Sequence, residues 1–319
     1  MAELNKLTDF KRRLIDELDK NCRQSNAQIA KRLKVGKNVV NYRLNSLIKE
    51  QIITGFYSVV DIAKLGYFGI RLYLKLRFAT KKKEQEILNS LVKSNVTWWV
   101  GSIDGDYDIG IVVRVKEIND FYNFWDHFSK LYHRYMGKST IHVHKATHEY
   151  SSSFFSVEGR KISYAGFVEH AQLSKKEKLV LSTLAEQSRM PIVEIAQKTG
   201  ISTIAVKNII SRLVKRGIIK AFKLKLNYDK LGLTLYKINF SLNDFSKKAE
   251  MLSYTNNHSN VLFVDESIGF ADFEVSFLVE NYARFKEILN NYKSKFSDSI
   301  ADVNYFVYSK IHKIKYFED

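Results

Sequence analysis

Three histidines with even spacing are the residues of this sequence best suited to bind a metal ion. His142, His144 and His148 lie on a segment expected to form a strand, where alternate residues point to one face. A His-x-His pair on one face can bind zinc or a similar metal. No Cys/His cluster, glycine-rich phosphate loop or Ser/His/Asp spacing accompanies them. We therefore interpret the histidines as partly exposed sheet residues and predict no metal, no cofactor and no enzymatic activity.

A second set of residues suits the bases and phosphates of DNA. Asparagine bonds the adenine edge with two hydrogen bonds, and lysine or arginine reaches guanine or phosphate. Side chains of these types fall on the outer face of two segments with helical spacing. The predicted DNA contacts are Lys37, Asn38, Asn41, Tyr42, Arg43 and Asn45 in the first segment and Thr203, Lys207, Asn208 and Arg212 in the second.

The charge of the chain supports a polyanionic partner. The 319 residues carry 51 Lys and Arg against 34 Asp and Glu, a net charge of +17. Residues 1–60 contribute a surplus of 6 and residues 171–230 a surplus of 9, so the excess is concentrated in two modules. Two basic modules are the electrostatic footprint of a protein that binds nucleic acid.

Composition excludes several other classes of protein. Cys22 is the only cysteine, which excludes an internal disulfide and a cysteine-rich zinc site. No apolar run approaches the roughly 18 residues of a membrane-spanning helix. The first residues lack the apolar core of a secretory signal, so we expect a cytoplasmic protein without membrane contact.

The chain contains an internal repeat with a constant offset of 166 residues. Ile29-Ala30 aligns with Ile195-Ala196, and Lys64-Leu65-Gly66 aligns with Lys230-Leu231-Gly232. Such an offset is too long for a solenoid and indicates duplicated domains.

Each copy begins with three segments of helical spacing. In copy one, Ser25 can cap a helix over Asn26–Leu33, and a short turn leads to a third helix. We expect Val39, Val40, Leu44, Leu47 and Ile48 on its inner face. Two short helices joined by a tight turn are the signature of a helix-turn-helix. Strand segments follow at Ile52–Val60 and Ile218–Leu226, the position of a wing.

The rest of each copy alternates strands and helices. Strand spacing at 68–78, an amphipathic helix at 81–94, and two strands around Asp104-Gly105-Asp106 precede a second helix and a last strand. Copy two has the same order, βαββαβ, which is that of a ferredoxin-like unit. The predicted class is α+β, with two winged helix-turn-helix and two ferredoxin-like domains in tandem. The predicted boundaries are 1–66, 67–149, a linker at 150–172, 173–232 and 233–319.

With these motifs in place, each half resembles the Lrp/AsnC family of transcription regulators. The residues that carry the resemblance are Asn21-x-Arg23-x-Ser25, Ile29-Ala30, Val39/Val40, Arg43, Leu44, Leu47, Ile52-x-x-Gly55, Asp61, Leu65-Gly66 and the turn Gly105-Asp106-Tyr107-Asp108. Copy two departs from the pattern: Ile209 replaces Arg43, and the turn Gly269-Phe270-Ala271-Asp272 lacks the tyrosine. These departures indicate that the two halves have specialised.

The resemblance implies a sequence-specific DNA-binding regulator with an amino-acid effector. The effector residues carried over are Gly105, Asp108, Gly269 and Asp272. A glycine turn exposes N–H groups that suit a carboxylate, although the same pattern also makes a plain hairpin turn.

The resemblance also implies that the fused copies form a dimer within one polypeptide, which can pair further. Because the two heads differ, the DNA site need not be a palindrome. Two alternatives stay open: an enzyme on the same fold that decarboxylates a haem precursor, as some relatives of the family do, and a protein that coats DNA without specificity.

Overall fold

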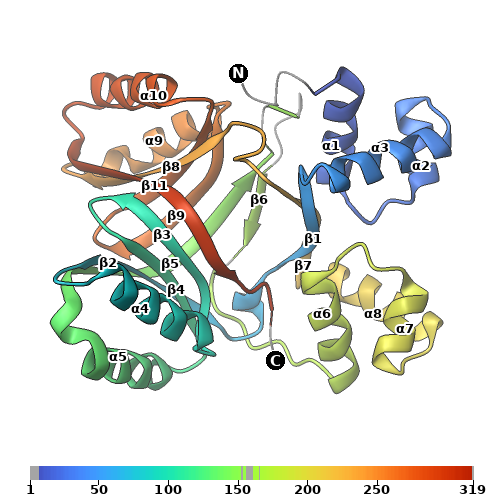
Figure 1. The fold of residues 1–319 in the computed structure, drawn as a ribbon, viewed down its shortest axis with the longest axis horizontal. Coiled ribbons are helices and arrows are strands. Elements are labelled where there is room, and N and C mark those ends of the chain that lie inside the picture. The colour runs from blue at the N-terminus through green and yellow to red at the C-terminus, as the bar shows by residue number, and fades with distance from the viewer. Residues whose placement is uncertain (1–6, 152–153, 156–160, 165, 318–319) are drawn as a thin grey trace.

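The structure is a computed structural model, described for residues 7–151, 154–155, 161–164 and 166–317. Two helical heads lie on one side of the molecule (Figure 1). Long strands lie on the other, with the helices α4 (Lys81–Lys93), α5 (Ile118–Tyr132), α9 (Lys248–Asn256) and α10 (Tyr282–Lys295). Head one comprises α1 (Asp9–Lys20), α2 (Asn26–Leu33) and α3 (Lys37–Lys49). Head two comprises α6 (Lys175–Glu186), α7 (Ile192–Thr199) and α8 (Thr203–Lys215). The fold is of the α+β class, as predicted.

Local sequence explains where the head helices begin and turn. Ser25 caps α2 in a capping box with Gln28, because the hydroxyl and the amide satisfy two N–H groups that have no partner within the helix. Ser174 and Glu177 do the same for α6. The turn before each third helix needs a left-handed residue, which is Lys34 in head one and Gly200 in head two. Glycine adopts this conformation without steric cost.

The inner face of α3 is narrower than predicted. Val40, Leu44 and Leu47 are buried, whereas Val39 and Ile48 are 43% and 38% exposed. The prediction that these last two residues face inward was wrong. They lie beside the buried stripe of Val40, Leu44 and Leu47, which packs against α1, α2 and β1.

One strand follows each head, and the two strands pair with each other. Strand β1 (Ile53–Val60) runs antiparallel to β7 (Ile219–Leu226) in a separate two-stranded sheet. The wing position of each head is thus occupied by a strand whose partner comes from the other copy. This pairing places the pseudo-two-fold axis of the duplication between the two strands.

The βαββαβ order of both copies is confirmed. Copy one contains β2 (Phe68–Leu76), α4 (Lys81–Lys93), β3 (Thr97–Gly105), β4 (Ile109–Val115), α5 (Ile118–Tyr132) and β5 (Met136–Tyr150). Copy two contains β8 (Thr234–Leu242), α9 (Lys248–Asn256), β9 (Val261–Gly269), β10 (Phe273–Val279), α10 (Tyr282–Lys295) and β11 (Ile300–Ile314). Short 3₁₀ turns occur at Ile62–Lys64, His133–Tyr135 and Phe245–Lys247.

The strands of the two copies form one continuous sheet. In the described residues its order is β2-β4-β3-β11-β8-β10-β9-β5-β6, and β2 also pairs with β5. That extra pairing closes all strands but β6 into a cylinder, which we call the barrel. The last strand of each copy makes the closure. The first half of β5 pairs with β2 of its own copy and the second half with β9, and β11 passes in the same way from β8 to β3.

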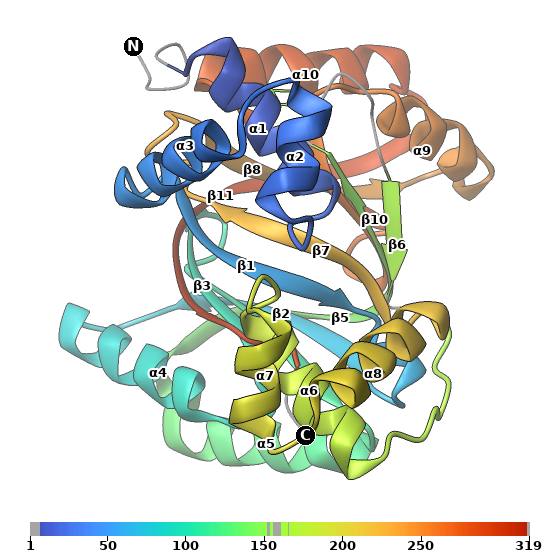
Figure 2. The same cartoon turned by 90° about the vertical axis from the view of Figure 1, so that its right-hand side faces the viewer.

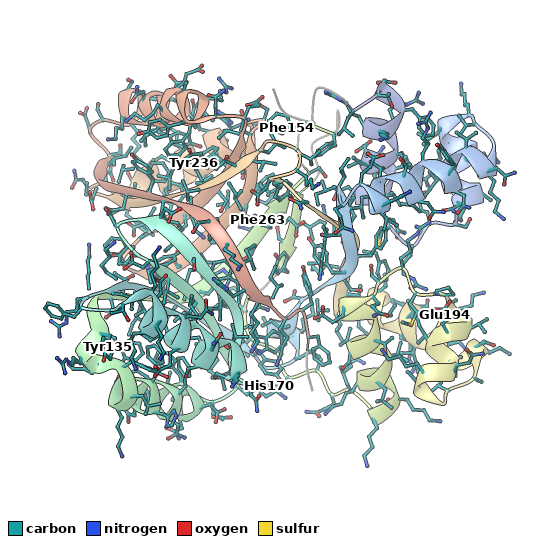
Figure 3. All side chains as sticks on the ribbon, viewed as in Figure 1. Tyr135, Phe154, His170, Glu194, Tyr236 and Phe263 are labelled. Carbon is teal, nitrogen blue, oxygen red and sulfur yellow. The ribbon has the colours of Figure 1, made fainter. Side chains whose placement is uncertain are left out.

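Each head packs against the barrel half of the other copy. The apolar core of head one includes Leu224, Leu231, Leu262 and Leu278 of copy two. The core of head two includes Val60, Ile62, Leu65 and Trp98 of copy one. The same exchange is seen in the strands, since α1 contacts β7 and α6 contacts β1, and Figure 2 shows these two strands running between the heads. Side chains such as Phe154 and Phe263 fill the space between head one and the barrel (Figure 3).

Part of the predicted linker, 150–172, lies outside the described residues. Within its described part, β6 (Lys161–Tyr164) pairs with the end of β5, and Leu65 forms a bridge with His170. The domain boundaries given above stay predictions. Among the described helices, none combines the length and the apolar character needed to cross a membrane.

Candidate functional site

The two third helices present the predicted DNA contacts to solvent. On α3, Lys37, Asn38, Asn41, Tyr42 and Asn45 are exposed and Arg43 is half-buried. On α8, Thr203, Lys207, Asn208 and Arg212 are all exposed, while Val206, Ile209 and Leu213 anchor the helix in its core. Each helix thus has an apolar side that holds it in its head and a polar side free to enter a groove. As DNA contacts these residues stay predictions.

Several of these side chains have partners within their own head. Asn41 accepts a hydrogen bond from Asn26 at 3.2 Å. The guanidinium of Arg43 lies 5.6 Å from the ring centre of Tyr42, and Arg212 lies 3.4 Å from a carboxylate oxygen of Glu177. These contacts hold the polar side chains in defined positions and lower the entropy lost on binding.

Sequence reasoning missed two apolar residues on the outer face of head two. Ile204 is 74% exposed and Val193 is 57% exposed. At the offset of 166 residues, Ile204 takes the place of Asn38, so the repeat alignment carried the signal. The two heads therefore present different chemistry at the same structural position.

A cationic groove opens on head one. It has a volume of about 660 Å³ and is lined by Asn21, Arg23, Gln24, Gln28, Lys31 and Arg32. Groups of this kind suit phosphate oxygens, which position a protein on DNA without reading its sequence.

The four predicted effector residues have structural roles in the barrel. Asp108 accepts hydrogen bonds from the backbone N–H of Leu76 and from Lys75, both at 2.7 Å. Asp272 accepts one from the N–H of Leu242 at 2.8 Å. At Gly269, φ is +135° and a Cβ atom would lie 2.5 Å from the carbonyl oxygen of Ile141, so the glycine permits β5 to cross. Gly105 occupies the equivalent place beside β11. Their role as effector ligands stays a prediction.

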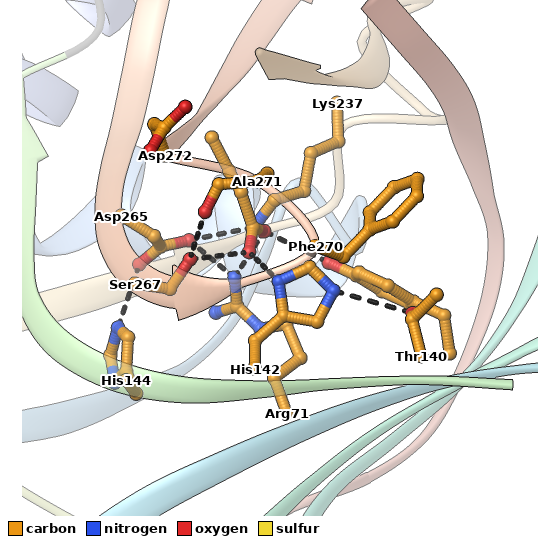
Figure 4. A network of polar contacts seen from close by, with 12 residues as sticks. Arg71, Thr140, His142, His144, Lys237, Asp265, Ser267, Phe270, Ala271 and Asp272 are labelled. Atoms are coloured by element: carbon orange, nitrogen blue, oxygen red, sulfur yellow. Dashed lines mark hydrogen bonds and ion pairs between the residues drawn. The ribbon is translucent and has the colours of Figure 1, made fainter. Parts of the chain in front are cut away.

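A buried charged cluster fills one part of the barrel (Figure 4). We use this name for Arg71, Lys237, Asp265, Glu274, His142 and His144. The lysine Nζ lies 2.7 Å from Asp265 and 2.5 Å from Glu274. Arg71 Nη1 lies 3.0 Å and 2.5 Å from the same two carboxylates. Two cations and two anions thus share one buried site.

The histidines complete this cluster. His142 Nδ1 lies 3.2 Å from Glu274, and His144 Nε2 lies 3.3 Å from Asp265. The prediction that these two histidines are partly exposed was wrong, since both side chains are almost fully buried. A register shift between His144 and Ala146 breaks the alternation, so His148 contacts Glu266 and Ser163 instead. Among the described residues, no group of three His, Cys, Asp or Glu side chains has the arrangement of a metal site.

Charge pairing controls ionisation within the cluster. Burial acts to raise the pKa of Asp265, but Arg71 and Lys237 overcome it and hold that pKa well below its ordinary value. The pKa of Glu274 is held well below its ordinary value in the same way. Burial lowers the pKa of His144 despite the nearby Asp265. At neutral pH both carboxylates are therefore charged, and the uncharged form of His144 is favoured.

Only the cations of the cluster repeat across the pseudo-two-fold axis, since Arg71 on β2 and Lys237 on β8 occupy equivalent positions. The two carboxylates have no equivalent in copy one. Asp265 on β9 pairs with Glu274 on β10, and Gly101 on β3 pairs with Gly110 on β4. Because β3 and β4 are the copy-one equivalents of β9 and β10, the two glycines occupy the positions of the two carboxylates. The indole of Trp99 covers both glycines, and a Cβ atom on either would meet the ring at 2.4 Å and 2.9 Å. One part of the barrel is thus aromatic and the other ionic. Sequence reasoning missed this, because the members come from strands far apart in the chain.

Comparison with known proteins finds a family match in each head, at the spacing of the repeat. The family model for winged helix-turn-helix DNA-binding domains matches residues 7–54 and 173–220, one segment in each copy. The transcriptional regulator LrpA of Pyrococcus horikoshii is 36% identical over 66 residues, which are 21% of this chain and 47% of that protein. That match spans about half the length of the relative.

A longer match comes from Pyrococcus furiosus. An uncharacterized HTH-type transcriptional regulator is 30% identical over 122 residues, 38% of this chain and 79% of that protein. The chain therefore belongs to the Lrp/AsnC family of helix-turn-helix regulators, and it contains the family unit twice.

A solved structure matches the whole chain. The siroheme decarboxylase NirDL, determined in complex with an iron-uroporphyrin III analogue, superimposes with a TM-score of 0.66 at 12% identity and covers 98% of this chain and 95% of its own. This likeness shows a shared fold. It corrects our prediction that the chain is not an enzyme, because the fold of the entire chain is one that an enzyme uses.

Proposed function

We propose that this protein is a sequence-specific transcription regulator that reads two unlike DNA half-sites with its two heads. The observation that carries the proposal is the pair of exposed outer faces on α3 and α8, which differ at matching positions. Asn38 on head one corresponds to Ile204 on head two, and Asn41 corresponds to Lys207. Both helices are anchored in their cores by apolar side chains, as a recognition helix must be.

The chemistry of each face indicates what it reads. Asn38 and Asn41 suit adenine, whose major-groove edge offers one acceptor and one donor. Ile204 suits the methyl group of thymine, and Lys207 suits guanine or phosphate. The heads therefore favour different base sequences, and the duplex is bound in one orientation.

The surplus of positive charge supplies affinity. The two modules that hold most of the excess contain the heads. Lysines and arginines that contact phosphates release counterions from the DNA. The logarithm of the binding constant therefore falls linearly with the logarithm of the salt concentration.

Site selection from a random duplex library, followed by sequencing at several salt concentrations, tests the proposal. We expect an enriched motif with two unlike half-sites and a steep loss of binding with salt. The double variant N38A/N41A should lose the preference at one half-site only, while the I204A variant changes the other. A strictly palindromic motif would contradict unlike reading. Salt-sensitive binding with no enriched motif would identify a coating protein instead.

Effector control is a separate part of the proposal. Titration calorimetry of the intact protein against each amino acid is the measurement, with D108N as the matched variant because an amide keeps one oxygen acceptor for the N–H of Leu76. Heat with one amino acid that weakens in the variant supports binding at the predicted residues. No heat with any of them removes the effector from the proposal.

The whole-chain likeness to a decarboxylase makes an enzyme the second candidate. The observation that favours it is the buried charged cluster, which places two cations and two histidines inside the barrel. Histidines such as His142 and His144 are groups that can return a proton to the carbon that loses CO₂, while both cations are already paired with Asp265 and Glu274. Titration with iron-uroporphyrin III, followed by absorbance and mass spectrometry of the pigment, tests it. A spectral shift with loss of CO₂ supports the enzyme, and an unchanged spectrum contradicts it.

A further inference from the structure

The two heads touch each other directly, and the contacts repeat at the offset of the duplication. The backbone N–H of Cys22 donates to the carbonyl of Phe222 at 2.9 Å, and that of Ser188 donates to the carbonyl of Phe56 at 3.3 Å. Cys22 Sγ and Ser188 Oγ, 166 residues apart, lie 2.9 Å from each other. Burial raises the pKa of the Cys22 thiol to about 11, so it stays protonated. The local two-fold axis passes through this point.

Two arginines cross this axis in opposite directions. Arg23 donates from Nη1 to the carbonyl oxygens of Ser188 at 2.5 Å and Met190 at 3.1 Å. Arg189 donates to the carbonyl oxygens of Cys22 and Gln24, the latter at 3.0 Å. We call these two residues the arginine clamp. Each guanidinium thus binds the backbone of the opposite head.

Aromatic rings hold the clamp from behind. The guanidinium of Arg23 lies 5.6 Å from the ring centre of Phe222, and that of Arg189 lies 5.7 Å from the ring centre of Phe56. Burial lowers the pKa of both arginines, and neither has a carboxylate among the groups that shift it. Charges placed without anionic partners cost free energy. The carbonyl oxygens of the opposite head and the two rings are therefore among their partners.

The clamp joins the two heads to each other directly. Apolar packing against the barrel is non-directional and tolerates small displacements. The directional contacts of each head otherwise go to the strands: Lys223 on β7 pairs with Asp19 on α1, and Ser58 on β1 donates to the carbonyl of Leu184 on α6. Arg23 reaches both of its carbonyls from Nη1, and Arg189 uses Nη1 for its carbonyls and Nη2 for Asn26 Oδ1 at 2.5 Å. Hydrogen bonds from a planar guanidinium fix both distance and angle, so the clamp adds a directional attachment between the heads.

We infer that Arg23 and Arg189 are positioning residues that lock the two heads into one rigid reader, which accepts two half-sites at a single spacing. This inference rests on the proposed DNA-binding function. A rigid pair of heads requires half-sites on one face of the duplex, about one helical turn or a multiple apart. A pair joined only by flexible contacts would engage half-sites at many spacings.

The spacing between half-sites in a selected DNA pool is the readout. The wild-type protein, the double variant R23K/R189K and the control R77K are each selected on the same random duplex library. Lysine keeps the charge but not the planar guanidinium. Arg77 also donates to a backbone carbonyl and lies against an aromatic ring, but it belongs to the barrel half and not to a head. If the double variant fails to fold, R23K and R189K alone give the same comparison.

We expect one dominant spacing for the wild type and the control, and a broad distribution for R23K/R189K. On a selected site lengthened by five base pairs, wild-type binding should fall about 100-fold, because the second head can no longer engage. The same change should cost the double variant less than about 10-fold.

Two outcomes overturn the inference: an unchanged spacing profile in R23K/R189K, or a wild-type protein that accepts all spacings equally. Absence of wild-type binding to any duplex would overturn the proposed function instead, so the two failures are distinguishable.

Discussion

At the scale of residues, the buried charged cluster is the feature most sensitive to substitution. Arg71 and Lys237 compensate Asp265 and Glu274 within 3.0 Å. All four groups are removed from water, so each charge is tolerated only because it is paired. Removal of one group leaves the others uncompensated and destabilises the protein. The cluster is therefore a site where a single change has a large effect.

We expect Lys237→Met to destabilise the protein by about 3–5 kcal/mol, the usual cost of leaving a buried charge unpaired. The matched control is Lys145→Gln, because Lys145 is 54% exposed and lies 3.6 Å from Glu266. That change should alter stability by less than about 0.5 kcal/mol. Urea unfolding followed by circular dichroism measures both. If the two variants were equally stable, Lys237 would not stabilise the buried carboxylates.

The same pairing predicts how stability depends on pH. The carboxyl pKa values of Asp265 and Glu274 lie well below their ordinary values of 3.8 and 4.5 in the folded protein. The unfolded chain therefore binds protons first as the pH falls, and the stabilisation is present above these ordinary values and lost below them. Unfolding free energies measured from pH 7 down to pH 4 should fall more steeply below pH 5 than those of D265N/E274Q. Parallel curves would contradict this.

At the scale of elements, an ion triad joins head one to the barrel. Lys223 on β7 lies 2.7 Å from Asp19 on α1 and 3.4 Å from Glu149 on β5. Tyr57 on β1 also donates to Glu149, at 3.2 Å. β5 carries the two cluster histidines as well, so one strand connects the interior of the barrel to the base of head one.

We predict that Lys223→Met destabilises the protein and that Glu149→Gln partly rescues it. Burial already raises the pKa of Glu149 despite Lys223, so loss of the lysine leaves a carboxylate that is costly to keep charged. The single variant should lose about 3 kcal/mol, and K223M/E149Q should recover at least about 1 kcal/mol of it. A double-mutant cycle in urea gives the coupling. Strict additivity of the two changes would contradict a direct interaction.

At the scale of the whole molecule, the sequence copies are not independent folding units. The cores of both heads contain residues of the other copy, and the barrel closes only through strands that pass between copies. Because each half exposes apolar surface and unpaired strand edges when alone, it must find a partner or aggregate.

We expect the separated halves, 1–151 and 166–319, to be unstable as monomers. Expressed alone, each should form dimers or aggregates, and mixing the two during refolding should restore a one-to-one complex. Light scattering coupled to size-exclusion chromatography measures the mass of each species. A half that remains a well-folded monomer at micromolar concentration would contradict the shared core.

The sequence by itself determined the class of each element and the duplication. Periodicity is a local property, so the helix-turn-helix segments, the βαββαβ order and the offset that aligns Ile29 with Ile195 could be read without a structure. The exposed faces of α3 and α8 followed from the same spacing. Their residues could therefore be named in advance. Val39 is an exception, because it lies at the edge of the apolar stripe and was predicted to face inward.

Only the tertiary structure decided which parts of the two copies meet. Alternation in a strand gives the face of a side chain but not its neighbour on another strand, so the meeting of Arg71 with Asp265 could not be foreseen. The pairing of β1 with β7, the passage of β5 and β11 between copies, and the crossing of Arg23 and Arg189 are likewise contacts between residues far apart in sequence. They arise because each copy can bury its apolar faces and strand edges only against the other.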